Sequence, residues 1–173
     1  MSLVNNILST LQEKYLTDLL VEGFVDKTEN PLKFHAMLSH WYLKFEDVYL
    51  RCTSIGQADR LRIEFIDQVT LSFDMDEDDQ FCISSVYEMR LPYTGPSHTN
   101  YVAALKLFSE SETYFQAGIL KRAEFQLGIV GTLFLEPTIY GIYIGKEQDR
   151  DKWMQNNLDA NSDYEFAWER NNQ

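Results

Sequence analysis

Near the N-terminus, apolar residues recur at steps of three and four, which is the spacing of one face of an amphipathic helix. This face consists of Val4, Ile7, Leu8, Leu11, Tyr15 and Leu19. The pattern predicts a helix from Ser2 to Phe24, capped by Ser2 and stopped at Gly23. After a polar loop, residues 32–45 fit two patterns equally well: a short helix running into a strand, or a first strand outright.

Between Asp47 and Leu91 the hydrophobic period changes to two. Apolar and polar residues alternate in four runs, separated by turn signals, at 48–52, 61–65, 69–73 and 81–87. Alternation of this kind is typical of strands that bury one face and leave the other in water. We therefore expect an antiparallel meander of about four strands.

Helical spacing returns after a loop at 92–100. Tyr101 to Phe108 predict a helix, which either continues to Leu127 or gives way to a new helix where Ser109 and Glu112 have the spacing of a capping box. Two apolar, β-prone runs follow at 128–136 and 138–145, joined at Pro137, and we interpret them as a hairpin.

The last segments are predicted to be a short helix at 148–158 and a polar C-terminal extension at 159–173. The order of elements favours an α+β fold, in which the meander and the C-terminal hairpin form an antiparallel sheet with helices packed on one face. A length of 173 residues fits a single domain spanning 1–173.

Composition narrows the set of partners. The formal net charge is −12 and 45% of the residues are hydrophobic, so the chain has material for a core but repels phosphate backbones and anionic lipids. We expect no nucleic-acid or membrane partner, and the charge permits a basic protein partner. Glu13, Lys14 and Asp18 near the N-terminus are atypical of a signal peptide, and two cysteines are few for a disulfide scaffold, so a cytoplasmic location is expected.

Tests for metal and catalytic motifs give no predicted catalytic, cofactor or metal residue. The acidic run at 74–79 has Asp79 where a calcium-binding loop needs glycine and Ser85 where it needs glutamate. It is interpreted as a solvated hairpin tip, with weak cation binding as the alternative. His35 and His40 are spaced five apart, which suits no single metal on one regular element. Cys52 and Cys82 fall within predicted strands.

Aromatic clusters carry the remaining hypothesis. Tyrosine and tryptophan are enriched at interfaces, which makes these residues candidates for an interface or ligand groove: Trp41, Tyr42, Tyr140, Tyr143, Tyr164, Phe166 and Trp168. The leading hypothesis is a non-enzymatic acidic interaction module, of chaperone, adaptor or immunity type, that binds a protein partner and forms a homodimer. One alternative is a small-molecule binding domain with an apolar pocket near Trp41, Phe73 and Tyr87. The other is a small hydrolase whose site forms where His40 or His98 meets a carboxylate or a nucleophile.

Overall fold

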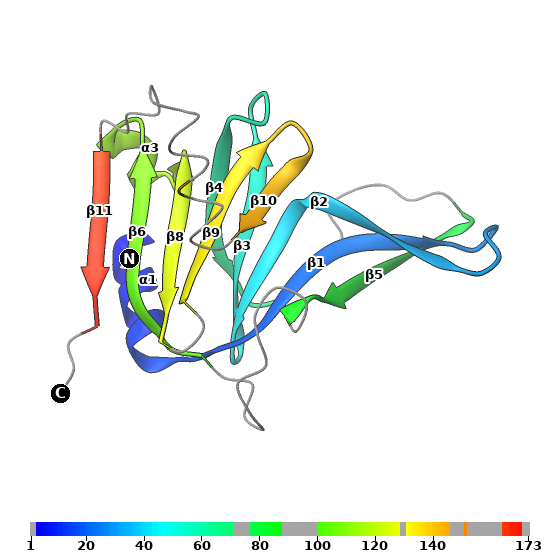
Figure 1. Cartoon of the computed structure of the whole chain (residues 1–173), viewed down its shortest axis with the longest axis horizontal. Coiled ribbons are helices and arrows are strands. Elements are labelled where there is room, and N and C mark those ends of the chain that lie inside the picture. Colours follow the sequence, from blue (N-terminus) through cyan, green and yellow to red (C-terminus); the bar gives the residue numbers. More distant parts are fainter. Residues whose placement is uncertain are drawn as a thin grey trace.

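The computed structural model describes residues 3–70, 77–87, 100–128, 131–145, 151 and 164–170. Within these ranges the chain forms two antiparallel sheets packed face to face, two helices, and an arm that projects from one side (Figure 1).

Sheet A has six strands in the order β5-β1-β2-β3-β4-β7. Their bounds are β1 (Leu16–Asp26), β2 (Lys33–Phe45), β3 (Val48–Ile55), β4 (Arg60–Ile66), β5 (Asp79–Ser85) and β7 (Ile119–Leu120). Strands β1 to β4 form a meander, whereas β5 returns to pair with β1 on its other side.

Sheet B has five strands in the order β10-β9-β8-β6-β11. Their bounds are β6 (Val102–Ser109), β8 (Arg122–Leu127), β9 (Gly131–Thr138), β10 (Gly141–Gly145) and β11 (Tyr164–Glu169). The short helix α3 (Glu112–Gln116) lies between β6 and β7, and the hydroxyl of Ser111 caps it by accepting from the amide of Tyr114.

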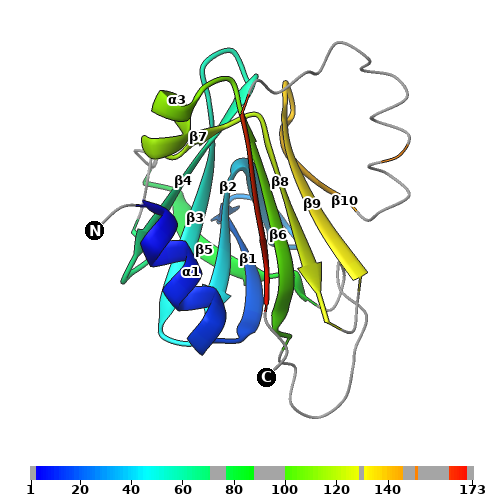
Figure 2. The same cartoon turned by 90° about the vertical axis from the view of Figure 1, so that its left-hand side faces the viewer.

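The core lies between the two sheets. Alternate residues of each sheet point inward and are almost fully buried, among them Leu19, Trp41, Leu50 and Ile63 from sheet A and Leu105, Phe125, Leu133 and Ile144 from sheet B. Helix α1 (Leu3–Glu13) lies beside the opening between the sheets and adds Ile7 and Leu11 to this core (Figure 2).

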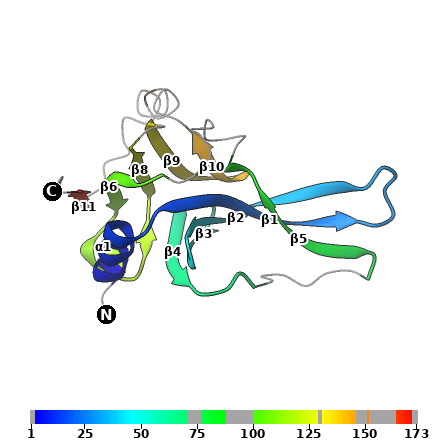
Figure 3. The same ribbon diagram turned by 90° about the horizontal axis from the view of Figure 1, so that it is seen from below.

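The far halves of β1 and β2, together with β5, extend beyond the area that sheet B covers (Figure 3). We call this three-stranded projection the arm, and it comprises Glu22–Asp26, Lys33–Leu38 and Asp79–Ser85. Where the arm leaves the body, the β1–β2 register shifts: Val21 pairs with Trp41, but Gly23 pairs with Ala36. The extra residues of β2 form a wide bulge opposite Glu22, and such bulges bend a strand pair.

The predicted α+β class is wrong. Of the described residues, 63% are in strands and 14% are helical, and the two sheets pack on each other instead of on a layer of helices. The physical reason is that several strands are buried on both faces, so their apolar residues do not alternate. Such runs cannot be separated from helices by periodicity.

Two predicted helices account for the error. The helix expected from Ser2 to Phe24 ends at Glu13, and strand β1 begins at Leu16. The helix expected from Tyr101 onward is strand β6, followed by α3 and then by β7 and β8.

Several other predictions agree with the structure, and some concern residues that it does not describe. Residues 32–45 are mostly strand β2, the second of the two alternatives, and β3 and β4 are antiparallel neighbours as expected. The C-terminal hairpin is confirmed, although its turn lies at Thr138–Gly141, beyond Pro137, which pairs within β9. In the strand predicted at 69–73, Val69 lies outside any strand, and residues 71–76 are not among the described residues. Nearly all of the helix predicted at 148–158 also lies outside the described residues. The C-terminal stretch contributes β11 to sheet B.

Candidate functional site

Exposed apolar side chains gather on the arm and on the neighbouring β9–β10 turn. Of the nine large apolar side chains exposed within the described ranges, seven lie on the arm, in the loop that joins its strands β1 and β2, or on the β9–β10 hairpin: Leu32, Phe34, Leu38, Ile83, Ile139, Tyr140 and Tyr143. We call these seven residues the exposed apolar surface. Large groups of such side chains on a monomer mark interaction sites.

The β9–β10 turn presents its two apolar residues outward on a well-held backbone. Ile139 is 77% exposed and Tyr140 is 82% exposed. The Thr138 hydroxyl accepts from the amide of Tyr140 at 3.2 Å and donates to the carbonyl of Gly141 at 2.8 Å. These bonds close the turn on itself, so the two side chains point into solvent from a fixed base.

The turn is also seated on the base of the arm. A methyl group added to Gly141 would lie 2.6 Å from the backbone and Cβ of Leu38. The indole of Trp41 donates to the carbonyl of Leu38 at 2.9 Å and so fixes the same residue from the core side. The turn therefore contacts the base of the arm directly at Leu38.

The hairpin end of the arm is ordered by polar contacts. Asp26 accepts from the amide and the hydroxyl of Thr28 at 2.7 and 2.6 Å, and these bonds lower the pKa of its carboxyl. Farther along, the ring of His35 stacks on Phe24 with centroids 5.1 Å apart, and its Nε2 lies 3.2 Å from the carboxylate of Glu29. The arm thus carries its apolar residues on a locally braced structure.

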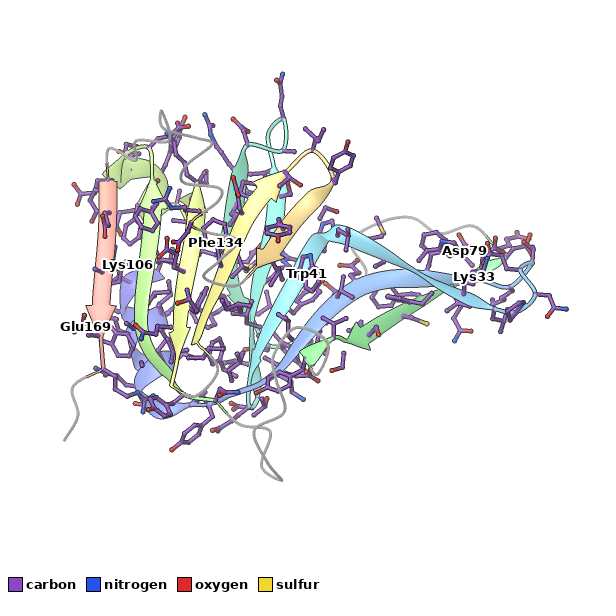
Figure 4. The ribbon with its side chains drawn as sticks, in the orientation of Figure 1. Lys33, Trp41, Asp79, Lys106, Phe134 and Glu169 are labelled. Carbon is purple, nitrogen blue, oxygen red and sulfur yellow. The ribbon has the colours of Figure 1, made fainter. Side chains whose placement is uncertain are left out.

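Acidic residues outnumber basic residues at the far end of the arm. Lys33 and Asp79 mark this end (Figure 4). The acidic residues are Asp26, Glu29, Glu77, Asp78 and Asp79, against Lys27 and Lys33. The exposed apolar residues of the arm therefore have an anionic border.

A second feature is a polar network on the outer face of sheet A, at the bulge. The hydroxyl of Tyr42 donates to the fully buried Glu22 at 2.6 Å. Burial and this bond raise the pKa of Tyr42 well above its usual value. On the next strands, the guanidinium of Arg51 donates to Glu64 at 2.7 and 3.1 Å. The network therefore runs across the sheet from β1 through β2 and β3 to β4.

His40 lies in the bulge beside this network. Its Nδ1 is 3.0 Å from the hydroxyl of Ser39. Burial lowers the pKa of His40, Glu22 opposes this shift and Arg51 adds to it, and the net direction is downward. The imidazole is therefore largely neutral near pH 7 and able to accept a proton.

A third feature is a group of buried charged residues on the outer face of sheet B, namely Arg122, Glu124 and Glu136. Glu124 pairs with Phe134, which Figure 4 labels. The Arg122 guanidinium lies 3.8 Å from the centroid of the Phe108 ring and 3.7 Å from Glu124. Burial raises the pKa of nearby Glu136 to about 7, against the charge of Arg122. The pKa of Glu136 therefore lies near neutral pH.

The aromatic residues singled out in the sequence are not one cluster. Trp41 and Tyr42 are neighbours on β2 and are buried, one in the core and one in the polar network. Tyr140 and Tyr143 are exposed on the β9–β10 hairpin. The aromatic residues of β11 are half-buried against the core, and two of them contact Phe115: Tyr164, Phe166 and Trp168.

The remaining candidate residues are dispersed. Tyr87 is packed in the core and accepts a hydrogen bond from Asn100, while Phe73 and His98 lie outside the described residues. Across the described ranges, no three histidine, cysteine, aspartate or glutamate side chains are placed to hold a metal ion. Residues 74–76 of the acidic run lie outside those ranges.

Five residues of the exposed apolar surface were not identified from the sequence: Leu32, Phe34, Leu38, Ile83 and Ile139. A usable signal existed for Ile139, because an apolar residue is unusual in a tight turn. For the arm residues the sequence carries no such signal, since apolar residues in a strand are normally read as core.

Comparison with family models, with curated proteins and with solved structures gives no match. None of the described helices is both long and apolar enough to cross a lipid bilayer.

Proposed function

We propose that the chain is a non-enzymatic protein-interaction module that binds its partner through the exposed apolar surface. The observation that carries this proposal is the exposure of seven large apolar side chains on the arm and the β9–β10 turn, next to a core in which comparable residues are almost fully buried. Complete burial of a fully exposed side chain of this kind contributes about 1.5–3 kcal/mol. Ile139 and Tyr140, which are 77% and 82% exposed, come closest to that limit.

The geometry of the turn suits a binding anchor. Tyr140 offers a large amphipathic ring with few rotatable bonds, which makes its immobilisation inexpensive in entropy. Because Thr138 and the contact of Gly141 with Leu38 hold the backbone, little further ordering is required on binding.

Charge favours a basic partner. The chain carries a net charge of −12, and the far end of the arm is locally acidic. Opposite charge on a partner would accelerate encounter, and this acceleration would weaken as salt rises.

The proposal is tested by co-purification from the native host with chemical cross-linking and quantitative mass spectrometry. Ile139→Ser and Tyr140→Ser are compared with Gln126→Ser, an exposed polar position at the other end of the β8–β9 pair. We expect the two turn variants to lose at least one protein that wild type and Gln126→Ser retain. Recovery of the same proteins by all four chains would overturn the proposal.

A hydrolase is the second candidate, and one contact favours it: the 3.0 Å approach of His40 to the Ser39 hydroxyl, close to the carboxyl group of Glu22. A hydroxyl beside a neutral imidazole is the minimum that acyl transfer requires. A fluorophosphonate probe would label Ser39 in this case, with loss of labelling in Ser39→Ala and His40→Ala. Absence of labelling in wild type would remove this candidate.

A further inference from the structure

We infer that Trp41, although it is buried in the core, is a positioning residue for the β9–β10 turn, and that it acts through the backbone carbonyl of Leu38. This inference rests on the proposed function, because it takes Ile139 and Tyr140 of that turn as the binding anchor. It adds the means by which the core holds the anchor in place.

Trp41 is held on both sides by its neighbours in sheet A. It is almost fully buried, and its backbone pairs with Val21 of β1 on one side and with Cys52 of β3 on the other. It lies where the arm begins, on the strand β2 that β10 contacts (Figure 4). Because side chains in a close-packed core have little freedom to move, the indole is a fixed point from which neighbouring groups can be positioned.

The residues of β2 just before Trp41 depend on a side-chain hydrogen bond. Among the described strands, the pairing of β2 with β1 passes directly from Ala36 to Trp41, and its pairing with β3 begins at His40. Residues 37–39 therefore lie outside both registers. The indole Nε1 of Trp41 donates to the carbonyl of Leu38 at 2.9 Å. This bond ties the Leu38 carbonyl to the core.

The β9–β10 turn rests on the same carbonyl group. A Cβ built on Gly141 would lie 2.6 Å from the carbonyl carbon, the carbonyl oxygen and the Cβ of Leu38, so the two segments are in close contact. The carbonyl of Gly141 accepts from the Thr138 hydroxyl, and this hydroxyl accepts from the amide of Tyr140. One line of contacts thus runs from the indole through the Leu38 carbonyl to Tyr140.

This line of contacts orders the binding anchor before a partner is present. A segment that is already ordered loses less entropy when it binds. If the indole bond is removed, the Leu38 carbonyl can shift, and the turn loses the fixed group on which it rests. We therefore expect Trp41 to affect partner binding, although it has almost no exposed area of its own.

Amide hydrogen exchange measured by NMR tests the link in the absence of any partner. The reporter is the amide of Tyr140, which donates to Thr138. We expect its exchange rate to rise about fivefold in Trp41→Phe, the factor that corresponds to one hydrogen bond of about 1 kcal/mol. Trp168→Phe is the matched control, because Trp168 packs against the core from β11, at the opposite edge of sheet B from β10. An increase in Trp41→Phe no larger than that in Trp168→Phe would overturn the inference.

Combined variants separate positioning from a general loss of stability. If Trp41 and Gly141 act through the same carbonyl, the effects of Trp41→Phe and Gly141→Ala on the exchange rate should not add, because contacts that share a partner are coupled. The effects of Trp168→Phe and Gly141→Ala should add. Additive effects in both pairs would refute the shared contact.

The link can also be read in reverse, in a variant that keeps Trp41 and so remains informative if Trp41→Phe does not fold. Gly141→Ala pushes on the Leu38 carbonyl from the turn. We expect the indole N–H resonance of Trp41 to move in this variant, while that of Trp168 stays in place. A Trp41 resonance that does not move would also overturn the inference.

Co-purification distinguishes failure of this inference from failure of the proposed function. We expect Trp41→Phe to lose the protein that Tyr140→Ser loses, whereas Trp168→Phe retains it. If Tyr140→Ser loses a protein that Trp41→Phe retains in full, the positioning role fails and the proposed function stands. If the exchange rates change as expected but all variants recover the same proteins, the proposed function fails and the positioning of the turn by Trp41 stands.

Discussion

The carboxyl group of Glu136 makes a quantitative prediction about stability and pH. The residue is 8% exposed in sheet B, and burial raises its pKa from 4.5 to about 7. Because the folded state holds this proton more tightly than the unfolded state, the group's contribution to stability is fully present below pH 4.5. It is lost as the pH rises to about 7. At about 1.4 kcal/mol per pH unit, the loss amounts to about 3 kcal/mol.

Glu136→Gln removes the titration while keeping the shape of the side chain. We therefore expect the free energy of unfolding of this variant, relative to wild type, to rise by about 3 kcal/mol between pH 4.5 and pH 8. Urea unfolding followed by tryptophan fluorescence at several pH values measures the difference. Glu169→Gln, at an exposed position of β11, is the matched control and should show a much smaller trend. A difference for Glu136→Gln that is flat with pH would refute the reasoning.

Two further predictions concern the candidate sites. Tyr42→Phe deletes the donor to the buried Glu22 and should lower the free energy of unfolding by about 2 kcal/mol. Urea unfolding measures this loss, with Tyr140→Phe as the control because the hydroxyl of Tyr140 is in solvent. Equal losses for the two variants would contradict the assigned hydrogen bond. Gly141→Ala adds a methyl group against Leu38 at a φ of +108° and should cost about 1–3 kcal/mol more than Gly131→Ala. Gly131 also has a positive φ but open space around it, and equal losses in thermal unfolding would show that the close approach is unimportant.

The sequence predicts those strands that have one buried face and one solvent-exposed face. Strands β3 and β4 and the β9–β10 hairpin follow from alternation and turn signals. Strand β6 does not, because Leu105 and Leu107 face the core while Phe108 is covered on the other side by Arg122. In β1, Glu22 is buried on the face opposite Val21, so the same ambiguity arises there.

The candidate sites were harder to predict than the strands. The aromatic surplus indicated an interface, and Tyr140 and Tyr143 are exposed, but Trp41 is packed in the core. A side chain remains exposed where its strand extends beyond the area that the opposite sheet covers. That is decided by the pairing of β5 with β1, between residues far apart in sequence, and no local pattern encodes it.

The position of β1 in sheet A has a consequence for how the chain folds. Its pairing with β2 closes a short loop, whereas β5 must return from much later in the sequence, and long loops close slowly. One side of β1 is therefore open early in folding, when β5 of another chain can add to it in place of its own. We expect refolding at high protein concentration to produce exchanged oligomers and refolding at low concentration to avoid them.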